Sequence, residues 1–208
     1  MITVEGGEGA GKSTQVALLV AALGRAGIAA QATREPGGSA GAEAIRQLLL
    51  QGETERWDAV AEALLLFAAR RDHVVRLIRP ALEAGRWVIC DRFTDSTIAY
   101  QGYGRGLPLA ELAALQRFVI GDFVPDLTLI LDLPAAVGLA RAAGRVSAAA
   151  DRFERLDREF HRRLRDGFLS IAQAEPKRCA VIDASGEVAD VHRAIVAAVA
   201  ARLQVMLT

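Results

Sequence analysis

The chain has 208 residues, of which 52% are hydrophobic and 24% charged, so it can form a sizeable core and is not a disordered chain. Lys plus Arg number 25, as do Asp plus Glu, and the formal net charge is therefore zero. Because a non-specific nucleic-acid binder normally carries a basic excess, this balance argues against that class. The length favours a single domain over residues 1–208.

Several features bear on the cellular compartment. The first residues lack the positive, apolar and small-residue regions of a signal peptide, and charged residues interrupt the long apolar runs. Cys90 and Cys179 each lie in a short apolar run, which favours buried thiols over a disulfide or a metal site. We therefore expect a soluble cytoplasmic protein with no membrane partner.

Short apolar runs alternate with longer helical stretches along the whole chain. This pattern predicts an α/β fold in which helices cover both faces of a parallel five-stranded sheet. The expected strands are residues 2–4, 29–33, 87–90, 127–131 and 180–182. The expected helices are residues 12–25, 40–50, 58–84, 108–119, 134–143, 154–174 and 187–203. Pro80 should kink or break the third helix, whereas Pro108 and Pro134 suit first-turn positions.

The strongest motif is GGEGAGKS at residues 6–13, which follows an apolar strand and opens a helix. Its glycines let successive backbone N–H groups converge on phosphate oxygens, and the helix N-terminus adds partial positive charge. Lys12 supplies a full charge, and the Ser13 hydroxyl is a ligand for Mg²⁺. The motif predicts nucleoside triphosphate binding, with contacts from Gly6, Gly7, Glu8, Gly9, Ala10, Gly11, Lys12, Ser13 and Thr14.

Other sequence features narrow the class of P-loop protein. The chain contains no asparagine, so it cannot contain the Asn-Lys-x-Asp loop with which GTPases recognise guanine. It also lacks the Leu-Ser-Gly-Gly-Gln signature of transporter ATPases, and helicase or recombinase cores are usually longer. A small kinase that phosphorylates a small molecule remains.

Four further clusters support an acceptor site beside the P-loop. They are Thr33-Arg34-Glu35-Pro36-Gly37-Gly38, Phe67-Ala68-Ala69-Arg70-Arg71, Cys90-Asp91-Arg92-Phe93 and Ser96-Thr97-Ile98-Ala99-Tyr100-Gln101-Gly102. Three of them follow predicted strands, and ligands of open α/β sheets lie beyond the carboxyl ends of the strands. Together with the P-loop and PDLTLILD at residues 125–132, these clusters resemble thymidylate kinases over essentially the whole chain.

The resemblance implies a nucleoside monophosphate kinase that converts dTMP and Mg-ATP into dTDP and ADP, for dTTP synthesis, and that forms a homodimer. Arg34 and Arg92 would hold the monophosphate of dTMP, since the planar fork of arginine matches two phosphate oxygens. Asp91 would assist Mg²⁺ together with Ser13, and Glu35 would orient a neighbouring arginine and metal-bound water. Phe67 would stack on thymine, Arg70 would donate to a pyrimidine carbonyl, and Tyr100 would exclude a ribose 2′-hydroxyl. Ser96, Thr97 and Gln101 would lie near the base and sugar.

Each of these residues also has an ordinary structural interpretation. By itself, Phe67 would be a core residue, Arg70 a solvated one and Tyr100 a half-buried aromatic. Asp91 and Arg92 would be an ion pair at a strand end. Only their joint occurrence in this order favours the functional interpretation. Phe93 departs from the family, in which Tyr or His is frequent after the Asp-Arg pair.

Catalysis of phosphoryl transfer would depend on alignment and on stabilisation of charge, with Lys12, Arg92 and Asp91 as candidates. The P-loop holds no arginine, so the sequence resembles the thymidylate kinases that carry a catalytic arginine in a lid. The lid would be residues 141–152, with Arg145 favoured as the catalytic residue and Arg141 and Arg152 as alternatives; Arg152 is also expected to contact ATP. An ordinary surface loop is the other interpretation of this segment. Ser185 would lie on the adenine side.

Two alternatives to a dTMP kinase remain. One is a monophosphate kinase with a broader or different acceptor. The other is a nucleotide-binding regulatory module that binds ATP and transfers nothing.

Overall fold

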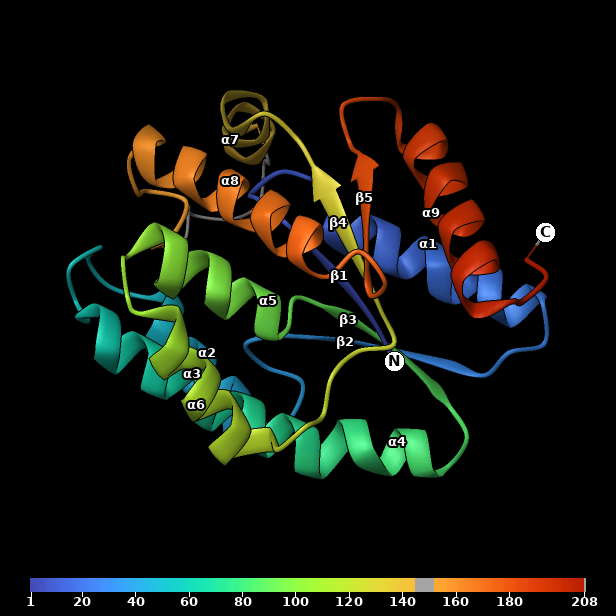
Figure 1. Ribbon diagram of the computed structural model, residues 1–208, viewed down its shortest axis with the longest axis horizontal. Helices are drawn as coiled ribbons and strands as arrows, with labels where there is room; N and C mark the ends of the chain where they lie inside the picture. Colours follow the sequence, from blue (N-terminus) through green and yellow to red (C-terminus); the bar gives the residue numbers. More distant parts are fainter. Residues whose placement is uncertain (145–151, 208) are drawn as a thin grey trace.

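The computed structural model describes residues 1–144 and 152–207. Its central sheet is parallel and has the strand order β2-β3-β1-β4-β5. The strands are β1 (Ile2–Gly6), β2 (Ala30–Arg34), β3 (Trp87–Asp91), β4 (Leu127–Asp132) and β5 (Cys179–Asp183). The predicted fold class and all five predicted strands are confirmed (Figure 1).

Helices connect the strands and form the outer layers (Figure 1). They are α1 (Lys12–Arg25), α2 (Ala40–Leu50), α3 (Ala59–His73), α4 (Arg79–Glu83), α5 (Thr94–Thr97), α6 (Leu109–Ile120), α7 (Ala135–Ala143), α8 (Arg158–Ala174) and α9 (Val188–Leu203). A π-helical turn, Val74–Ile78, joins α3 to α4, and a second π-helical segment, Ile98–Gly104, continues α5.

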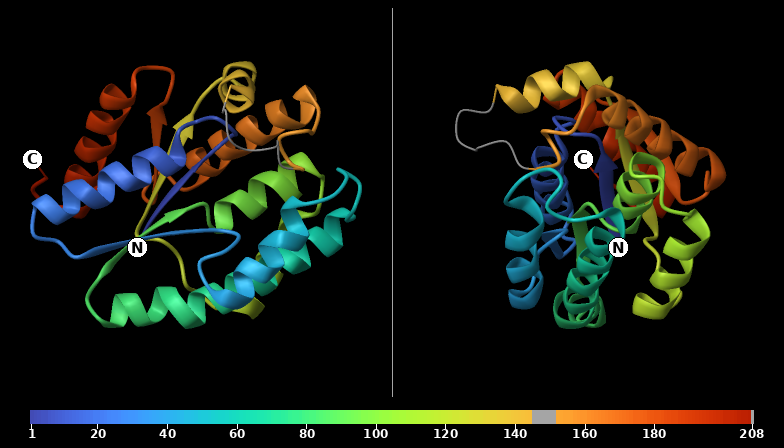
Figure 2. Two further views of the ribbon diagram at one scale, coloured as in Figure 1. Left: turned by 180° about the vertical axis from the view of Figure 1, so that it is seen from behind. Right: turned by 90° about the vertical axis from the view of Figure 1, so that its left-hand side faces the viewer.

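The helices cover the sheet on both faces, as the alternation of strands and helices predicts. Helices α1 and α9 pack together on one face, whereas α8, α5 and α4 lie against the other (Figures 1 and 2). Helices α2, α3 and α6 pack side by side beyond that second layer. Strand β1 is buried along its whole length, including its polar residues Thr3 and Glu5. Within the described part of the chain, no helix is both long and apolar enough to cross a membrane.

The helix boundaries differ from the prediction at the prolines and before α8. Pro80 does not end the long helix; the π-helical turn before it absorbs the lost backbone donor, and Pro80 lies in the first turn of α4. Pro108 and Pro134 precede α6 and α7 as N-caps, one residue earlier than predicted. Residues 154–157 are not helical, because Asp157 caps α8 and accepts a hydrogen bond from the Phe160 amide at 2.7 Å.

The sheet places the predicted motifs at one edge. In the parallel register, Val4 of β1 lies opposite Asp91 of β3, and Arg34 of β2 also lies opposite Asp91. The P-loop follows β1 directly, so the motifs that follow β1, β2 and β3 meet beyond the carboxyl ends of these strands.

Candidate active site

The P-loop curls around the N-terminus of α1. Gly9 has a φ of +68°, and a Cβ at this position would lie 2.0 Å from the carbonyl oxygen of Gly138, so only glycine fits. Lys12 donates from Nζ to the carbonyl oxygen of Gly7 at 2.7 Å. Burial and the charge of Arg92 lower the pKa of Lys12 to about 8. The Lys12 ammonium is therefore hydrogen-bonded to the P-loop backbone, and it lies within the electrostatic influence of the Arg92 guanidinium.

The end of β3 contributes an oxygen-rich pair next to the P-loop. Ser13 Oγ donates to Asp91 Oδ2 at 2.5 Å. A hydroxyl and a carboxylate are hard oxygen ligands of the kind that Mg²⁺ prefers, so this donor set fits a Mg²⁺ ion carried by nucleotide phosphates.

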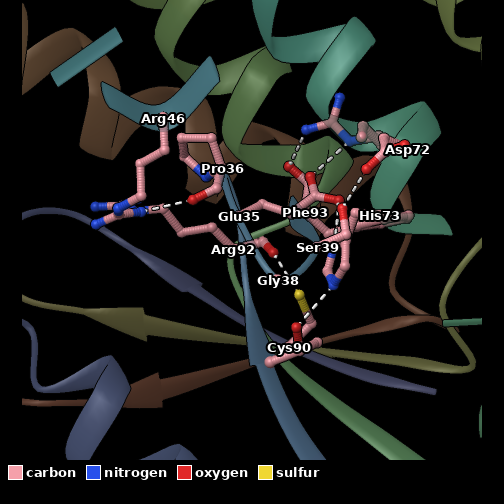
Figure 3. A network of polar contacts seen from close by, with 12 residues as sticks. Glu35, Pro36, Gly38, Ser39, Arg46, Asp72, His73, Cys90, Arg92 and Phe93 are labelled. Atoms are coloured by element: carbon pink, nitrogen blue, oxygen red, sulfur yellow. Dashed lines mark hydrogen bonds and ion pairs between the residues drawn. The ribbon is translucent and has the colours of Figure 1, made fainter. Parts of the chain in front are cut away.

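Arg92 occupies a tight turn immediately after β3. Its φ is +69°, a left-handed conformation that is uncommon for residues other than glycine. Cys90 Sγ donates to the Arg92 carbonyl oxygen (Figure 3). After Arg92 in the chain, the Phe93 amide and Ser96 Oγ both donate to the Glu5 carboxylate, at 2.7 Å and 2.6 Å. Contacts on both sides therefore hold the turn, and they fix the direction of the arginine.

The side chain of Arg92 joins the P-loop to the acceptor clusters. Nη1 donates to the Gly6 carbonyl oxygen at 3.0 Å, and Nη2 donates to Glu8 Oε1 at 2.8 Å. Its guanidinium lies 4.9 Å from the ring centre of Tyr100, whose hydroxyl donates to the same Glu8 oxygen at 2.5 Å. Burial raises the pKa of Glu8, but Arg92, Lys12 and Tyr100 outweigh it and bring the pKa down to about 2.

A buried network fixes Arg70 and the loop after β2, and Figure 3 shows two of its members, Glu35 and His73. Glu35 accepts from Arg70 Nε at 2.7 Å and from His73 Nδ1 at 3.0 Å. The other ring nitrogen of His73 hydrogen-bonds Thr33 Oγ1 at 2.7 Å. Arg70 Nη2 donates to Thr97 Oγ1 at 2.9 Å. Glu35 therefore orients Arg70 and links α3 to the loop after β2.

These elements enclose one pocket of about 430 Å³, a size typical of sites for small ligands. Lys12 of the P-loop lies in the same pocket as Arg34 and Arg92, the two arginines expected to bind the acceptor phosphate. Its lining includes the predicted residues Glu8, Gly9, Gly11, Lys12, Ser13, Thr14, Arg34, Glu35, Arg70, Asp91, Arg92, Ser96, Thr97, Tyr100, Gln101 and Arg141.

Comparison with known proteins agrees with this geometry. The family model described as thymidylate kinase matches residues 4–195. A thymidylate kinase from Caulobacter vibrioides is 57% identical over 97% of this chain and 96% of its own length. One from Rhizorhabdus wittichii is 52% identical over 96% of each chain. The crystal structure of thymidylate kinase from Ehrlichia chaffeensis has a TM-score of 0.75 and 38% identity, and the match covers 95% of this chain and 96% of that one.

The chain belongs to the thymidylate kinase family. As a member of this family, it phosphorylates dTMP to dTDP with ATP. The family relationship and the resemblance found in the sequence therefore agree.

The side chain expected to stack on thymine does not face the pocket. Phe67 is only 1% exposed and packs in a core cluster with Ala63 and Leu112, between α3 and α6. Its neighbour Leu66 lines the pocket instead. One step along a helix turns the side chain by about 100°, so the two residues cannot share a face. The expectation for Phe67 is therefore wrong, and α3 offers an aliphatic surface at this wall.

Arg152 also differs from the expectation that it contacts ATP. Its side chain is fully buried and hydrogen-bonds Glu62 of α3. Nε donates to the Leu49 carbonyl oxygen at 3.0 Å, and Nη1 donates to the Thr54 carbonyl oxygen at 2.9 Å. These partners belong to α2, α3 and the loop between them, so the guanidinium is engaged away from the P-loop.

Two arginines of the expected lid, Arg141 and Arg145, remain to be placed. Arg145 lies outside the described residues, as does most of the expected lid. Arg141 lines the pocket and donates to the carbonyl oxygens of Ala184 and Ser185, both at 2.9 Å. It therefore holds the loop between β5 and α9.

Sequence reasoning missed several residues that position the site. Glu5, Glu62 and His73 are buried beneath it, and Leu66 lines it. A signal was present for Glu5 and Glu62, because each is a charged residue within an otherwise apolar stretch. For Leu66 there was no signal that separated it from Leu64 or Leu65.

Proposed function

We propose that the pocket holds the phosphates of ATP on the P-loop and the monophosphate of dTMP against Arg34 and Arg92. The observation that carries this division is the link between Arg92 and the P-loop carbonyl of Gly6. An arginine in this position lies beside both phosphate sites and offsets the repulsion between two anionic substrates. Lys12, held by Gly7, supplies the positive charge on the ATP side.

The base of dTMP lies between Arg70 and Gln101 in this proposal. Arg70 and Gln101 line the pocket, and Arg70 Nη1 and Gln101 Oε1 are buried polar atoms that have no hydrogen-bond partner among the described residues. The first is a donor and the second an acceptor. Thymine presents a carbonyl oxygen next to the N3 proton, so a donor and an acceptor together complement this edge. Leu66 supplies an apolar surface for the ring.

The sugar lies between these two regions, next to Tyr100. This residue is almost completely buried, and Phe153, Phe160 and Phe168 contact its ring edge to face. A ring held from three sides cannot move away from a ribose 2′-hydroxyl. This rigidity supports a preference for the deoxynucleotide, with Ser96 and Thr97 on the neighbouring helical turn.

Mg²⁺ would be held by Ser13 and Asp91 together with nucleotide phosphates, and when bound it supplies neutralisation of charge on the transferred group. The chain's own residues supply alignment: the P-loop backbone orients the donor, and the fixed Arg92 turn orients the acceptor. Arg141 supports the adenine side by holding the carbonyl of Ser185. The unpaired buried thiols of Cys90 and Cys179 support a cytoplasmic location.

The test is a coupled assay of ADP release with dTMP, dUMP, dCMP, dAMP and dGMP as acceptors. We expect turnover on dTMP well above that on the others, and Arg92→Ala should lose transfer while ATP binding is retained. Arg76→Ala removes a surface arginine that pairs with Asp72 and serves as the control. Equal rates on all five acceptors would instead indicate a kinase of broad acceptor specificity. If no ADP were released with any of them, the protein would be a regulatory module.

We further propose a homodimer formed through α3 and α6. Val60 and Leu64 of α3 and Val75 of the π-helical turn that follows it are exposed apolar residues, and Phe118 of α6 is 87% exposed. Arg71 Nη1 donates to the Val119 carbonyl oxygen at 3.0 Å, which fixes the two helices side by side. An exposed apolar surface of this kind on adjacent helices supports association with a second copy.

A further inference from the structure

The amide of Gln101 is held by a carboxylate that lies outside the pocket. Gln101 Nε2 donates to Glu62 Oε1 at 2.7 Å, and the side chains of both residues are buried. Glu62 itself does not appear in the pocket lining. An ionised carboxylate only accepts hydrogen bonds, so the NH₂ end of the amide must face Glu62. The carbonyl oxygen of Gln101 must then point away from Glu62.

The second oxygen of Glu62 is occupied from the other side. Oε2 accepts from Arg152 Nη2, and Arg105 Nη2 lies 3.6 Å away. Two backbone carbonyl oxygens, those of Leu49 and Thr54, hold the guanidinium of Arg152 in turn. A buried carboxylate requires such a counter-charge and full hydrogen bonding. Glu62 therefore has a fixed position and leaves only Oε1 for the amide.

The fixed amide of Gln101 leaves an unpaired acceptor at the wall of the pocket. Gln101 lines the pocket, and its Oε1 is buried and has no hydrogen-bond partner within residues 1–144 and 152–207. Arg70, which Glu35 orients, adds an unpaired donor at Nη1. The amide and the guanidinium are thus each fixed by a buried glutamate. With the amide fixed, the wall offers one donor and one acceptor in an order that cannot reverse.

We propose that Glu62 is a specificity-determining positioning residue that acts through the amide of Gln101. Held in this way, Gln101 presents only its carbonyl oxygen, an acceptor, to the base. This acceptor suits a pyrimidine that carries a proton on N3 and disfavours cytosine, whose N3 is itself an acceptor. Two facing acceptors leave a buried polar group without a hydrogen bond, which is costly. This inference rests on the proposed position of the base between Arg70 and Gln101.

The experiment compares kcat/KM for dCMP and dTMP in the wild type and in variants. In Glu62→Gln, the new amide can either accept or donate, so Gln101 can rotate and offer its NH₂ group to cytosine. We expect the dCMP/dTMP ratio to rise about tenfold or more, with the KM for ATP unchanged. Because E62Q leaves Arg152 buried without its counter-charge, E62Q/R152M is measured in parallel. Glu55→Gln removes an exposed carboxylate near the same Arg105 and is the matched control.

A third variant, Gln101→Met, keeps the inference testable if the Glu62 variants do not fold. It removes the amide itself, so the dCMP/dTMP ratio must also rise. An unchanged ratio in Q101M, or in a folded E62Q/R152M protein, overturns the role of Glu62. A wild type that uses dCMP as well as dTMP contradicts the proposed base contact instead, which separates failure of the inference from failure of the proposed function.

Discussion

Ser13 Oγ donates a hydrogen bond to Asp91 Oδ2 over 2.5 Å, although 78 residues separate the two in the chain. The parallel sheet produces this contact, because β1 leads into the P-loop and β3, its neighbour, ends at Asp91. A divalent ion bound to the Ser13 hydroxyl would therefore lie next to a carboxylate. The arrangement makes the proposed metal site testable through Asp91 alone.

We predict that Asp91→Asn raises the Mg²⁺ concentration needed for half-maximal activity by about tenfold, because the site loses the negative charge of the carboxylate that accepts from Ser13. The measurement is a Mg²⁺ titration of dTMP-dependent ADP release at fixed ATP. Asp122→Asn, which changes an exposed carboxylate at the end of α6, should leave the titration unchanged. An Asp91→Asn titration identical to that of the wild type would remove Asp91 from the metal site.

The sequence predicts the frame of the fold well and the details of the site less well. Strand positions and the bounds of α1 and α2 follow from local patterns of apolar residues. The helical segment from Thr94 to Gly104 was not expected, since Gly102 and Gly104 have low helix propensity. Here packing overrides propensity: a Cβ on Gly102 would lie 2.5 Å from Leu109 Cδ2, and one on Gly104 equally close to the ring of Phe160.

Residue roles that depend on contacts between distant segments could not be predicted. Arg152 follows the expected lid in sequence, which suggested ATP, but its partner Glu62 lies 90 residues away on α3. Phe67 and Leu66 are both apolar, and only the packing of α3 on Leu112 of α6 decides which of them turns inward. The P-loop, Arg34, Asp91 and Arg92 could be placed because each lies at or directly after a strand end.

Leu66 and Phe67 should respond differently to truncation. We predict that Leu66→Ala raises the KM for dTMP several-fold with little loss of stability, because it removes an apolar wall of the pocket. Phe67→Ala should lower the free energy of unfolding by about 3 to 5 kcal/mol, because it leaves a cavity between α3 and α6. Steady-state kinetics and urea unfolding of the two variants provide the measurements. A Phe67→Ala protein with wild-type stability and a raised KM for dTMP would show that Phe67 contacts the base.

Glu5 should make stability depend on pH. Burial, followed by the charge of Asp95, raises the pKa of Glu5 from 4.5 to about 7, while Ser96 and Arg92 oppose the shift. Between these two pH values the folded protein holds a proton that the unfolded chain has lost. The contribution of Glu5 to the free energy of unfolding is therefore present below pH 4.5 and is lost as the pH rises through 7.

Glu5→Gln has no proton to lose at this position and can still accept from the Phe93 amide. We predict that the free energy of unfolding of Glu5→Gln, relative to that of the wild type, increases by about 2 to 3 kcal/mol from pH 5 to pH 8. Urea unfolding at intervals of one pH unit measures this gain. Parallel pH profiles for the two proteins would show that Glu5 titrates normally in the folded state.

Phe118 provides the test of the proposed dimer. It projects from α6 with 87% of its surface exposed, and the next residue, Val119, accepts a hydrogen bond from Arg71 of α3. Phe118→Asp places a charge where two copies would bury an aromatic ring, so we predict dissociation to monomers at micromolar concentration, measured by sedimentation velocity. Val181→Asp changes an exposed valine on the edge strand β5, outside α3 and α6; it is the control and should leave the mass unchanged. A Phe118→Asp protein that still sediments as a dimer places the interface on another face of the molecule.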